Sequence, residues 1–281
     1  MTLEIRELTV SFAGRRVSYI PSLDLEPGRI VGLVGESGSG KSMSTTAVLG
    51  LAGRLGATVT GSIRLDGIEL VGASNRVLRQ VRGRRIAMIF QSPSSAFHPI
   101  MKVGDVFVRA LRLHGAGTRS QARARAESAI AEMLLPPSVL DRYPHQMSGG
   151  QLQRVAIALA LALDAEVLLA DEPTSALDVT VQAEILTLLT QLRDRGRLAT
   201  LLISHDLAAV AEVADTVAVM RAGEMVEQGP TASVIHAPAT DYTRELLAAV
   251  PVLGQHRPLG ARCRAPEERH TPHMPQGGSD A

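Results

Sequence analysis

Residues 35–42 read GESGSGKS, and this stretch decides the fold. It matches the pattern G-x-x-x-x-G-K-[ST], which forms a phosphate-binding loop when it lies between a strand and a helix. A short apolar run, residues 29–34 (RIVGLV), precedes it and predicts a strand. Residues 41–53 (KSMSTTAVLGLAG) follow it and predict a helix that stops near Gly53. The pattern therefore occurs in the setting that it requires.

The residue types in this loop suit the phosphates of a nucleotide. Glycines let backbone N–H groups turn towards phosphate oxygens, Lys41 adds a positive charge at the β- and γ-phosphates, and Ser42 offers a hydroxyl to Mg2+. The alternative is a glycine-rich turn that contains Lys and Ser by chance, which is expected in about 1% of chains of this length at average residue usage. We therefore expect a nucleotide to contact the whole loop, that is Gly35, Glu36, Ser37, Gly38, Ser39, Gly40, Lys41 and Ser42.

The composition excludes several classes of protein. With 45% hydrophobic and 20% charged residues in 281, the chain can bury a core, which excludes a wholly disordered or fibrous protein. The balance of 29 Lys and Arg against 28 Asp and Glu gives no basic footprint, so nucleic acid is not expected as a partner. The longest apolar run, residues 155–163, is far shorter than the roughly 20 residues of a membrane-spanning helix. One cysteine and a start without a signal-peptide pattern indicate a cytosolic chain.

Outward from the loop, apolar runs and helical patterns alternate along the chain. The runs that predict further strands are residues 3–12, 62–65, 85–90, 167–170 and 199–203. The patterns that predict further helices are residues 151–163, 181–193 and 207–214. Such alternation implies a parallel sheet. Residues 217–220 and 224–227 predict a late hairpin.

The chain is expected to consist of one domain, residues 1–250, and a tail. Residues 92–147 interrupt the alternation with the loop SPSSAFHP and an Ala- and Arg-rich stretch of helical spacing at 118–135, which predicts an inserted helical subdomain. In residues 251–281 the composition shifts to five prolines and scattered charge, which predicts a flexible tail.

Two adjacent carboxylates follow the run VLLA at residues 167–170. Asp171 and Glu172 come where a buried strand ends, the usual position for ligand chemistry in an open α/β sheet. Asp171 is expected to hold Mg2+, directly or through water, and Glu172 to polarise the water that attacks the γ-phosphate. The alternative is an acidic strand terminus that leads into a turn at Pro173. The phosphate loop in the same chain favours the catalytic interpretation.

Four further motifs complete a set. MSGGQ at 147–151, Gln91 after its strand, SALD at 175–178 and His205 after ATLLIS occur in an order and spacing that resemble the ATP-binding cassette ATPases of ABC transporters, over residues 1 to about 250. The resemblance implies an α/β fold: a P-loop NTPase cassette with a RecA-like parallel-sheet core, an N-terminal antiparallel β subdomain and an inserted helical subdomain. It also implies hydrolysis of ATP with Mg2+.

The resemblance implies roles for individual residues. Glu172 is then the catalytic glutamate, His205 the switch histidine, and Gln91 the glutamine of the Q-loop, a catalytic residue that also serves the Mg2+ site with Ser42 and Asp171. The signature departs from the family only at Met147, where Leu is commoner, and this swap conserves volume. One chain has one phosphate loop and one signature, which in the family face each other across two subunits. The resemblance implies that the signature contacts the ATP between the two subunits through Ser148, Gly149, Gly150 and Gln151.

Three residues keep a structural alternative. Asp178 shapes the dimer contact or caps the helix that follows it. Phe12 matches the family's position for the aromatic that stacks on adenine, and the alternative is a core phenylalanine. His205 contacts the γ-phosphate or is a solvent-facing histidine at a strand end.

Several segments resemble one branch of the family, the ATPases of oligopeptide, dipeptide and nickel importers. They include ADEPTSALDVTVQAEIL and GEMVEQGP followed by TDYTRELLAAVP, and the phrase SAFHP favours nickel or metallophore cargo over peptides. The implied partners are a second, related cassette subunit, two integral membrane permeases that contact the inserted subdomain, and an extracytoplasmic substrate-binding protein. The implied location is the cytoplasmic face of the inner membrane.

The tail carries no expected site. Cys263 stands alone where peptide-type members often carry a cysteine cluster, so an iron–sulphur site is not expected. The tail histidines, His256, His270 and His273, are interpreted as solvated side chains rather than metal ligands.

The competing function is a soluble cassette ATPase of DNA repair or translation. Repair ATPases of this type separate the two ATP motifs with a long coiled coil, and residues 91–148 lack sustained heptads. Translation-type members carry two cassettes in one chain. A binding module without hydrolysis is disfavoured because Glu172 and His205 are both present.

Overall fold

The structure is a computed structural model that describes residues 2–175, 177–196 and 198–249. The predicted flexible tail, residues 251–281, lies outside the described residues, and so do its cysteine and its histidines. The division between domain and tail therefore stays a prediction.

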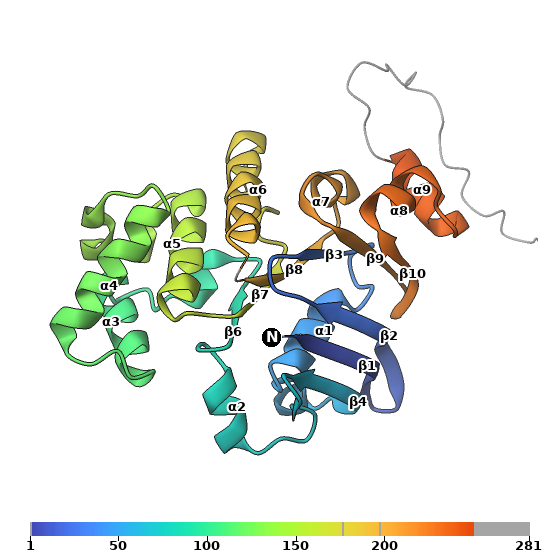
Figure 1. Cartoon of the computed structure of the whole chain (residues 1–281), viewed down its shortest axis with the longest axis horizontal. Helices are drawn as coiled ribbons and strands as arrows, with labels where there is room; N and C mark the ends of the chain where they lie inside the picture. The colour runs from blue at the N-terminus through green and yellow to red at the C-terminus, as the bar shows by residue number, and fades with distance from the viewer. Residues whose placement is uncertain (1, 176, 197, 250–281) are drawn as a thin grey trace, which may run out of the picture. The chain divides into compact units, whose positions relative to one another are not determined.

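One mixed sheet runs through the described residues, with the strand order β5-β4-β1-β2-β10-β9-β3-β8-β7-β6 (Figure 1). The strands are β1 Leu3–Phe12, β2 Arg15–Leu25, β3 Ile30–Val34, β4 Thr58–Leu65, β5 Ile68–Glu69, β6 Ile86–Ile89, β7 Val167–Asp171, β8 Ala199–Ser204, β9 Thr216–Arg221 and β10 Glu224–Pro230. Strands β9, β3, β8, β7 and β6 are parallel neighbours. Strands β5, β4, β1 and β2 are antiparallel, and β10 is antiparallel to β9. A single residue pair, Glu224 with Tyr19, joins β10 to β2.

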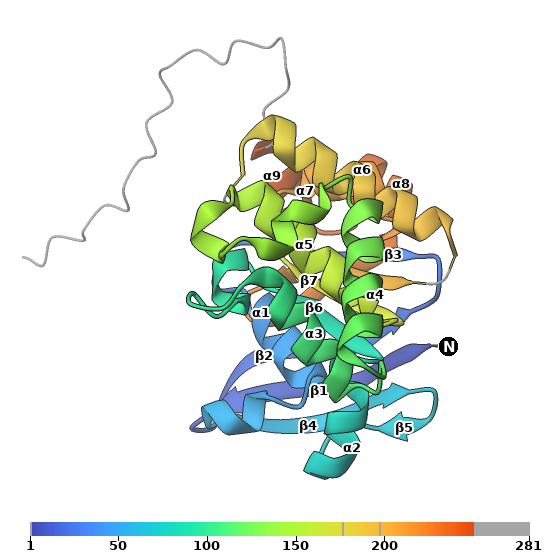
Figure 2. The ribbon, with the colours of Figure 1, turned by 90° about the vertical axis from the view of Figure 1, so that its left-hand side faces the viewer.

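Helices cover the parallel strands. The α-helices are α1 Lys41–Val48, α2 Asn75–Val81, α3 Val103–Leu113, α4 Arg119–Glu132, α5 Gly149–Ala162, α6 Val179–Asp194, α7 Leu207–Val213, α8 Thr231–His236 and α9 Asp241–Ala249. Short 3-10 turns are η1 Ala52–Leu55, η2 Pro93–Ala96, η3 Pro137–Asp141 and η4 Pro144–Gln146. Helices α3, α4 and α5 lie together and face the viewer in Figure 2, away from the antiparallel strands β1, β2 and β4.

The parallel strands separate two hydrophobic cores. Side chains alternate between the faces of a strand, and in β3 Ile30 and Val34 enter one core whereas Val31 and Leu33 enter the other. The first core also holds α5, α6, α7 and the inserted helices, and the second holds α1 and the inward faces of β1, β2 and β4. Helix α1, which follows the loop at residues 35–42, is therefore held in place by packing in the second core.

The architecture agrees with the expected fold class: a parallel core, antiparallel N-terminal strands and a helical insert between β6 and β7. The sequence patterns did not predict β2, β5, α2, α8 or α9. Helix α1 ends at Val48 rather than near Gly53, because Gly50 adopts a left-handed φ of 61° that a helix cannot continue. Within the described ranges, no helix is both long and apolar enough to cross a membrane.

Candidate active site

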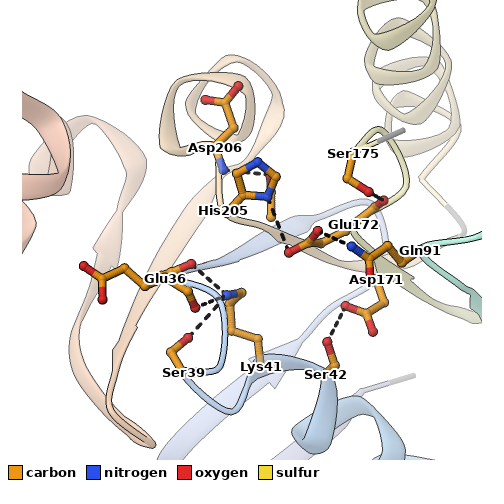
Figure 3. Close-up of polar contacts among 12 residues, drawn as sticks. Glu36, Ser39, Lys41, Ser42, Gln91, Asp171, Glu172, Ser175, His205 and Asp206 are labelled. Atoms are coloured by element: carbon orange, nitrogen blue, oxygen red, sulfur yellow. Dashed lines mark hydrogen bonds and ion pairs between the residues drawn. The ribbon is translucent and has the colours of Figure 1, made fainter. Parts of the chain in front are cut away.

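Four neighbouring parallel strands end at the same edge of the sheet, and each delivers site residues there. The phosphate loop follows β3, Gln91 follows β6, Asp171 and Glu172 end or follow β7, and His205 follows β8. Parallel strands present their carboxyl ends at one edge, where ligands bind in open α/β sheets. Figure 3 shows these side chains converging on one space.

Two glycines let the phosphate loop lie close to its neighbours. A Cβ at Gly35 would overlap the carbonyl oxygen of Met220, and one at Gly40 would overlap that of Val17, and both glycines have positive φ. A Cβ at Gly38, with φ +80°, would meet nothing within 4 Å. The loop is therefore packed tightly from outside and open at Gly38, as a phosphate cradle requires.

Lys41 is folded back onto the loop in this state. Its Nζ donates to the carbonyl oxygens of Gly35 at 2.7 Å and Glu36 at 2.8 Å, and it lies 3.3 Å from Ser39 Oγ. The residue is only 5% exposed. Burial lowers the pKa of the Lys41 amine, although the nearby carboxylates of Glu172 and Asp171 oppose this effect. The hydrogen bonds of the Lys41 ammonium group therefore go to neutral oxygen atoms, those of Gly35, Glu36 and Ser39, which phosphate oxygens can replace.

Ser42 and Asp171 form a pair of oxygen donors. Ser42 Oγ donates to Asp171 Oδ1 at 2.9 Å. Burial raises the pKa of Asp171, the hydrogen bond from Ser42 only partly offsets this, and the neighbouring charge of Glu172 raises it further. A hydroxyl and a buried carboxylate fit the oxygen preference of Mg2+.

Glu172 connects the two other candidate catalytic side chains. Its Oε2 accepts a hydrogen bond from Gln91 Nε2 at 2.9 Å, and its Oε1 lies 3.4 Å from His205 Nδ1. The Glu172 side chain is 13% exposed and that of His205 is 54% exposed. Glu172 has a φ of 46°, in the left-handed region that residues with side chains rarely adopt. Its own N–H donates to the carbonyl of Ile203, which fixes this conformation against β8.

A cavity of about 410 Å³ lies over the loop. Phe12 is half-buried at this cavity, beside Val17 of β2. The structure thus brings Phe12, residues 37–42, Gln91 and Glu172 together around one space. Stacking of Phe12 on adenine stays a prediction.

The signature residues do not line this cavity. Ser148 caps α5: its Oγ accepts from the Gln151 N–H at 3.2 Å, and the Gln151 side chain accepts from the Ser148 N–H at 3.2 Å. A Cβ at Gly150 would overlap Val181 of α6, so the two helix starts are in close contact. The signature residues thus form a capped helix start outside this cavity, and their contact with ATP stays a prediction.

Asp178 acts locally as a helix cap. Its Oδ1 accepts from the Val181 N–H at 3.0 Å at the start of α6. Of the two roles left open by the sequence, the cap is therefore present, and the dimer contact stays a prediction.

Sequence reasoning missed two contacts that hold the loop from outside. The Gly223 N–H, in the β9–β10 turn, donates to the Ser39 carbonyl at 3.1 Å, and the Glu36 N–H donates to the Tyr242 hydroxyl at 3.3 Å. The segment TDYTRELLAAVP was noted only as a family likeness. No local pattern marks either contact, because each joins segments that are far apart in sequence.

Comparison with known proteins agrees with this geometry. Residues 20–175 match the family described as ABC transporter. The chain is 42% identical over 255 residues to the oligopeptide transport ATP-binding protein OppD of Lactococcus lactis subsp. cremoris, covering 89% of this chain and 75% of that protein. It is 43% identical over 244 residues to the dipeptide transport ATP-binding protein DppD of Escherichia coli, covering 86% and 73%.

Among solved structures, the fold resembles the ATP-binding cassette MJ0796 in a dimeric post-hydrolysis state bound to ADP and Pi. The TM-score is 0.69 at 27% identity, over 82% of this chain and 98% of that chain. The family match and these likenesses confirm the expected fold class and the expected ATPase activity. This chain therefore belongs to the ABC transporter family, as an ATP-hydrolysing subunit.

Proposed function

We propose that the chain is the ATP-hydrolysing subunit of an importer for dipeptides or oligopeptides. The observation that carries the catalytic part is the position of the Glu172 carboxylate, which contacts Gln91 and His205 at the edge of the cavity over the phosphate loop. The names of the similar proteins OppD and DppD support the peptide part.

Binding of ATP starts at the phosphate loop. Lys41 releases the Gly35 and Glu36 carbonyls and turns to the phosphates. Their negative charge offsets the free-energy cost of burying the ammonium group. Backbone N–H groups of residues 37–42 take the remaining phosphate oxygens, and Phe12 covers the base. Ser42, Asp171 and Gln91 would hold Mg2+, and the ion would supply positive charge to the β- and γ-phosphates.

Hydrolysis requires a base beside the γ-phosphate. Glu172 accepts a proton from the attacking water as the new P–O bond forms and the bond to ADP breaks. Gln91 and His205, on either side of the carboxylate, keep it aimed at the cavity. Gln91 directly precedes the inserted helical subdomain, so its contact with Glu172 should respond to movement of that subdomain.

A second cassette completes each site. Ser148, Gly149, Gly150 and Gln151 form a capped helix start that does not line the cavity of its own chain. The helix N-terminus suits the γ-phosphate of ATP that is held by the other subunit. The dimeric MJ0796 cassette supports this arrangement, and we expect a related chain as the partner, with Asp178 near the contact.

The remaining partners follow from the importer assignment. Two integral membrane permeases contact the inserted helical subdomain, and an extracytoplasmic substrate-binding protein delivers cargo to them. The subunit is then peripheral, at the cytoplasmic face of the inner membrane. The preference for nickel or metallophore cargo drawn from SAFHP stays a prediction, and the named relatives favour peptides.

Two variants test the ATPase assignment. Lys41→Ala should abolish tight ATP binding, and an unchanged dissociation constant in equilibrium titration would exclude the phosphate-loop site. Glu172→Gln should keep ATP affinity and release phosphate at least a hundredfold more slowly, since general-base catalysis contributes about 10² to 10⁴. Near-normal phosphate release would exclude Glu172 as the base.

Cargo is tested in the assembled importer. With the partner cassette, permeases and binding protein in liposomes, dipeptides or oligopeptides should stimulate ATP hydrolysis and accumulate inside, and Glu172→Gln should stop both. Stimulation by nickel complexes and not by peptides would overturn the peptide assignment and leave the ATPase assignment intact.

A further inference from the structure

The C-terminal helix α9 touches the phosphate loop through one side chain. Tyr242 is 4% exposed, and its hydroxyl oxygen accepts the Glu36 backbone N–H at 3.3 Å. Helix α9 comes 206 residues later than the loop, and it lies outside the family match, which ends at residue 175. The contact approaches the loop from the protein side, because Tyr242 does not line the cavity over the loop.

The peptide unit that Tyr242 holds is the one that docks Lys41. The Glu36 N–H and the Gly35 carbonyl belong to the same peptide, and that carbonyl accepts Lys41 Nζ at 2.7 Å. In a trans peptide the N–H and C=O point in opposite directions, and no peptide bond in the described residues is cis. Tyr242 and Lys41 therefore form hydrogen bonds on opposite sides of one planar peptide unit.

The tyrosine is itself fixed firmly. The Arg221 guanidinium, at the end of β9, lies over its ring at 4.8 Å from the centroid. The Glu227 carboxylate of β10 accepts the N–H groups of Ala239 at 2.7 Å and Thr240 at 3.1 Å, just before α9 begins. The hydroxyl is thus placed by two strands and a helix that carry none of the catalytic side chains.

We propose that Tyr242 is a positioning residue for ATP binding. It sets the orientation of the Gly35–Glu36 peptide, so that this peptide keeps one anchor when Lys41 leaves it for the phosphates. Without the hydroxyl, this peptide unit has neither of its two side-chain hydrogen bonds once Lys41 departs, and nucleotide binding must then order it more. The inference rests on the nucleotide site proposed above and adds a residue, Tyr242, that raises the affinity of that site for ATP.

Tyr242→Phe separates this role from packing, since the ring, its burial and the contact with Arg221 remain. Loss of one hydrogen bond is expected to raise the KM and the dissociation constant for ATP about three- to tenfold. The kcat at saturating ATP should stay within twofold of wild type, because Gln91, Glu172 and His205 come from other strands. Thermal unfolding without nucleotide should change little.

Tyr19→Phe is the matched control. Tyr19 also lies under an arginine, Arg16 at 5.2 Å, and its hydroxyl donates to Glu7 at 2.7 Å, away from the residues that line the cavity. It should leave the KM for ATP unchanged. A Tyr242→Phe KM and dissociation constant within twofold of wild type would overturn the inference. So would a lowered melting temperature and kcat with an unchanged KM, the signature of a purely structural residue.

Lys41→Ala distinguishes failure of this inference from failure of the ATP site. If Lys41→Ala loses ATP affinity and Tyr242→Phe does not, the ATP site stands and the role of Tyr242 is wrong. If Lys41→Ala binds ATP normally, the site assignment fails and the role of Tyr242 fails with it.

Discussion

Asp171 is a buried carboxylate at the edge of the sheet, and the hydrogen bond from Ser42 and the charge of Lys41 only partly offset its burial. Its pKa is raised, first because burial disfavours the charged form. A carboxyl whose pKa is higher in the folded chain than in the unfolded chain binds its proton more tightly when folded. Folding stability from this group is therefore present at low pH and is lost as the pH rises from the unfolded pKa, near 3.9, through the folded pKa.

Asp171→Asn should therefore not destabilise the free protein at neutral pH. Asparagine keeps an oxygen that accepts from Ser42 and has no charge to bury. Without nucleotide, its melting temperature at pH 7.5 should equal or exceed that of wild type, and the advantage should shrink towards pH 4. Its Mg2+-dependent ATPase should be lost. A lower melting temperature at pH 7.5, with no difference at pH 4, would contradict the stated cause of the pKa shift.

Gly38→Ala should harm binding without harming the fold. A methyl group at Gly38 meets no atom within 4 Å and adds only the strain of a left-handed residue, about 1 to 2 kcal/mol, since φ is +80°. The methyl points into the space that phosphates need, so ATP affinity should fall at least tenfold in equilibrium titration.

Gly56→Ala provides the matched control for Gly38→Ala. Gly56 has φ +85°, equally open surroundings and no place in the cavity lining. Both variants should lose similar stability, and only Gly38→Ala should lose affinity. Equal affinities for the two would show that Gly38 does not face the phosphates.

Single residues were predictable where a motif is local. The phosphate loop and the Asp171–Glu172 pair are identified by spacing within a few residues, and the structure brings them together. The Tyr242 contact joins positions 206 residues apart, and its donor is a backbone N–H that every residue except proline has. The sequence of either segment alone holds no sign of it.

Strands were predictable where they form a continuous apolar run. Strands β3, β7 and β8 are buried along their whole length and read as continuous apolar runs. Strand β2 (RRVSYIPSLDL) was missed because polar residues and Pro21 dilute its alternation, and its place is set by pairing with β1. Helix α2 was missed because only two of its side chains, Leu78 and Val81, are buried, which leaves little amphipathic pattern, whereas the equally short α7 buries four.

The first turns of α5 and α6 pack against each other at Gly150 and Val181. Gly150→Ala should push α6 away, because the new methyl overlaps Val181. The steady-state ATPase rate should fall at least tenfold, while the single subunit keeps its ATP affinity, since Gly150 does not line the cavity. The ATPase rate is measured with the partner cassette present, and the ATP affinity is measured on the purified chain alone.

The double variant Gly150→Ala with Val181→Ala tests that cause. Trimming Val181 removes the overlapping atom, so activity should return towards that of Val181→Ala alone. A double variant as inactive as Gly150→Ala would mean that the glycine is needed for contact with nucleotide rather than for the packing of α5 on α6.

At the scale of the whole molecule, the signature residues at the start of α5 do not line the cavity over the phosphate loop of their own chain, which is why we propose that a second cassette completes the ATP site. Glu172→Gln with ATP should stay monomeric alone, and should form a one-to-one complex with a related cassette subunit. Size-exclusion chromatography with light scattering measures this directly. A stable, fully active homodimer would contradict the preference for a related partner.

The left-handed backbone at Glu172 has a consequence for the evolution of the chain. Glycine or asparagine would adopt its φ of 46° with less strain than glutamate. Selection for folding alone would therefore favour another residue here, and the proposed role of Glu172 in turnover accounts for the carboxylate. A descendant of this chain that no longer needs to hydrolyse ATP is expected to lose Glu172 early, while it keeps the loop glycines that its packing requires.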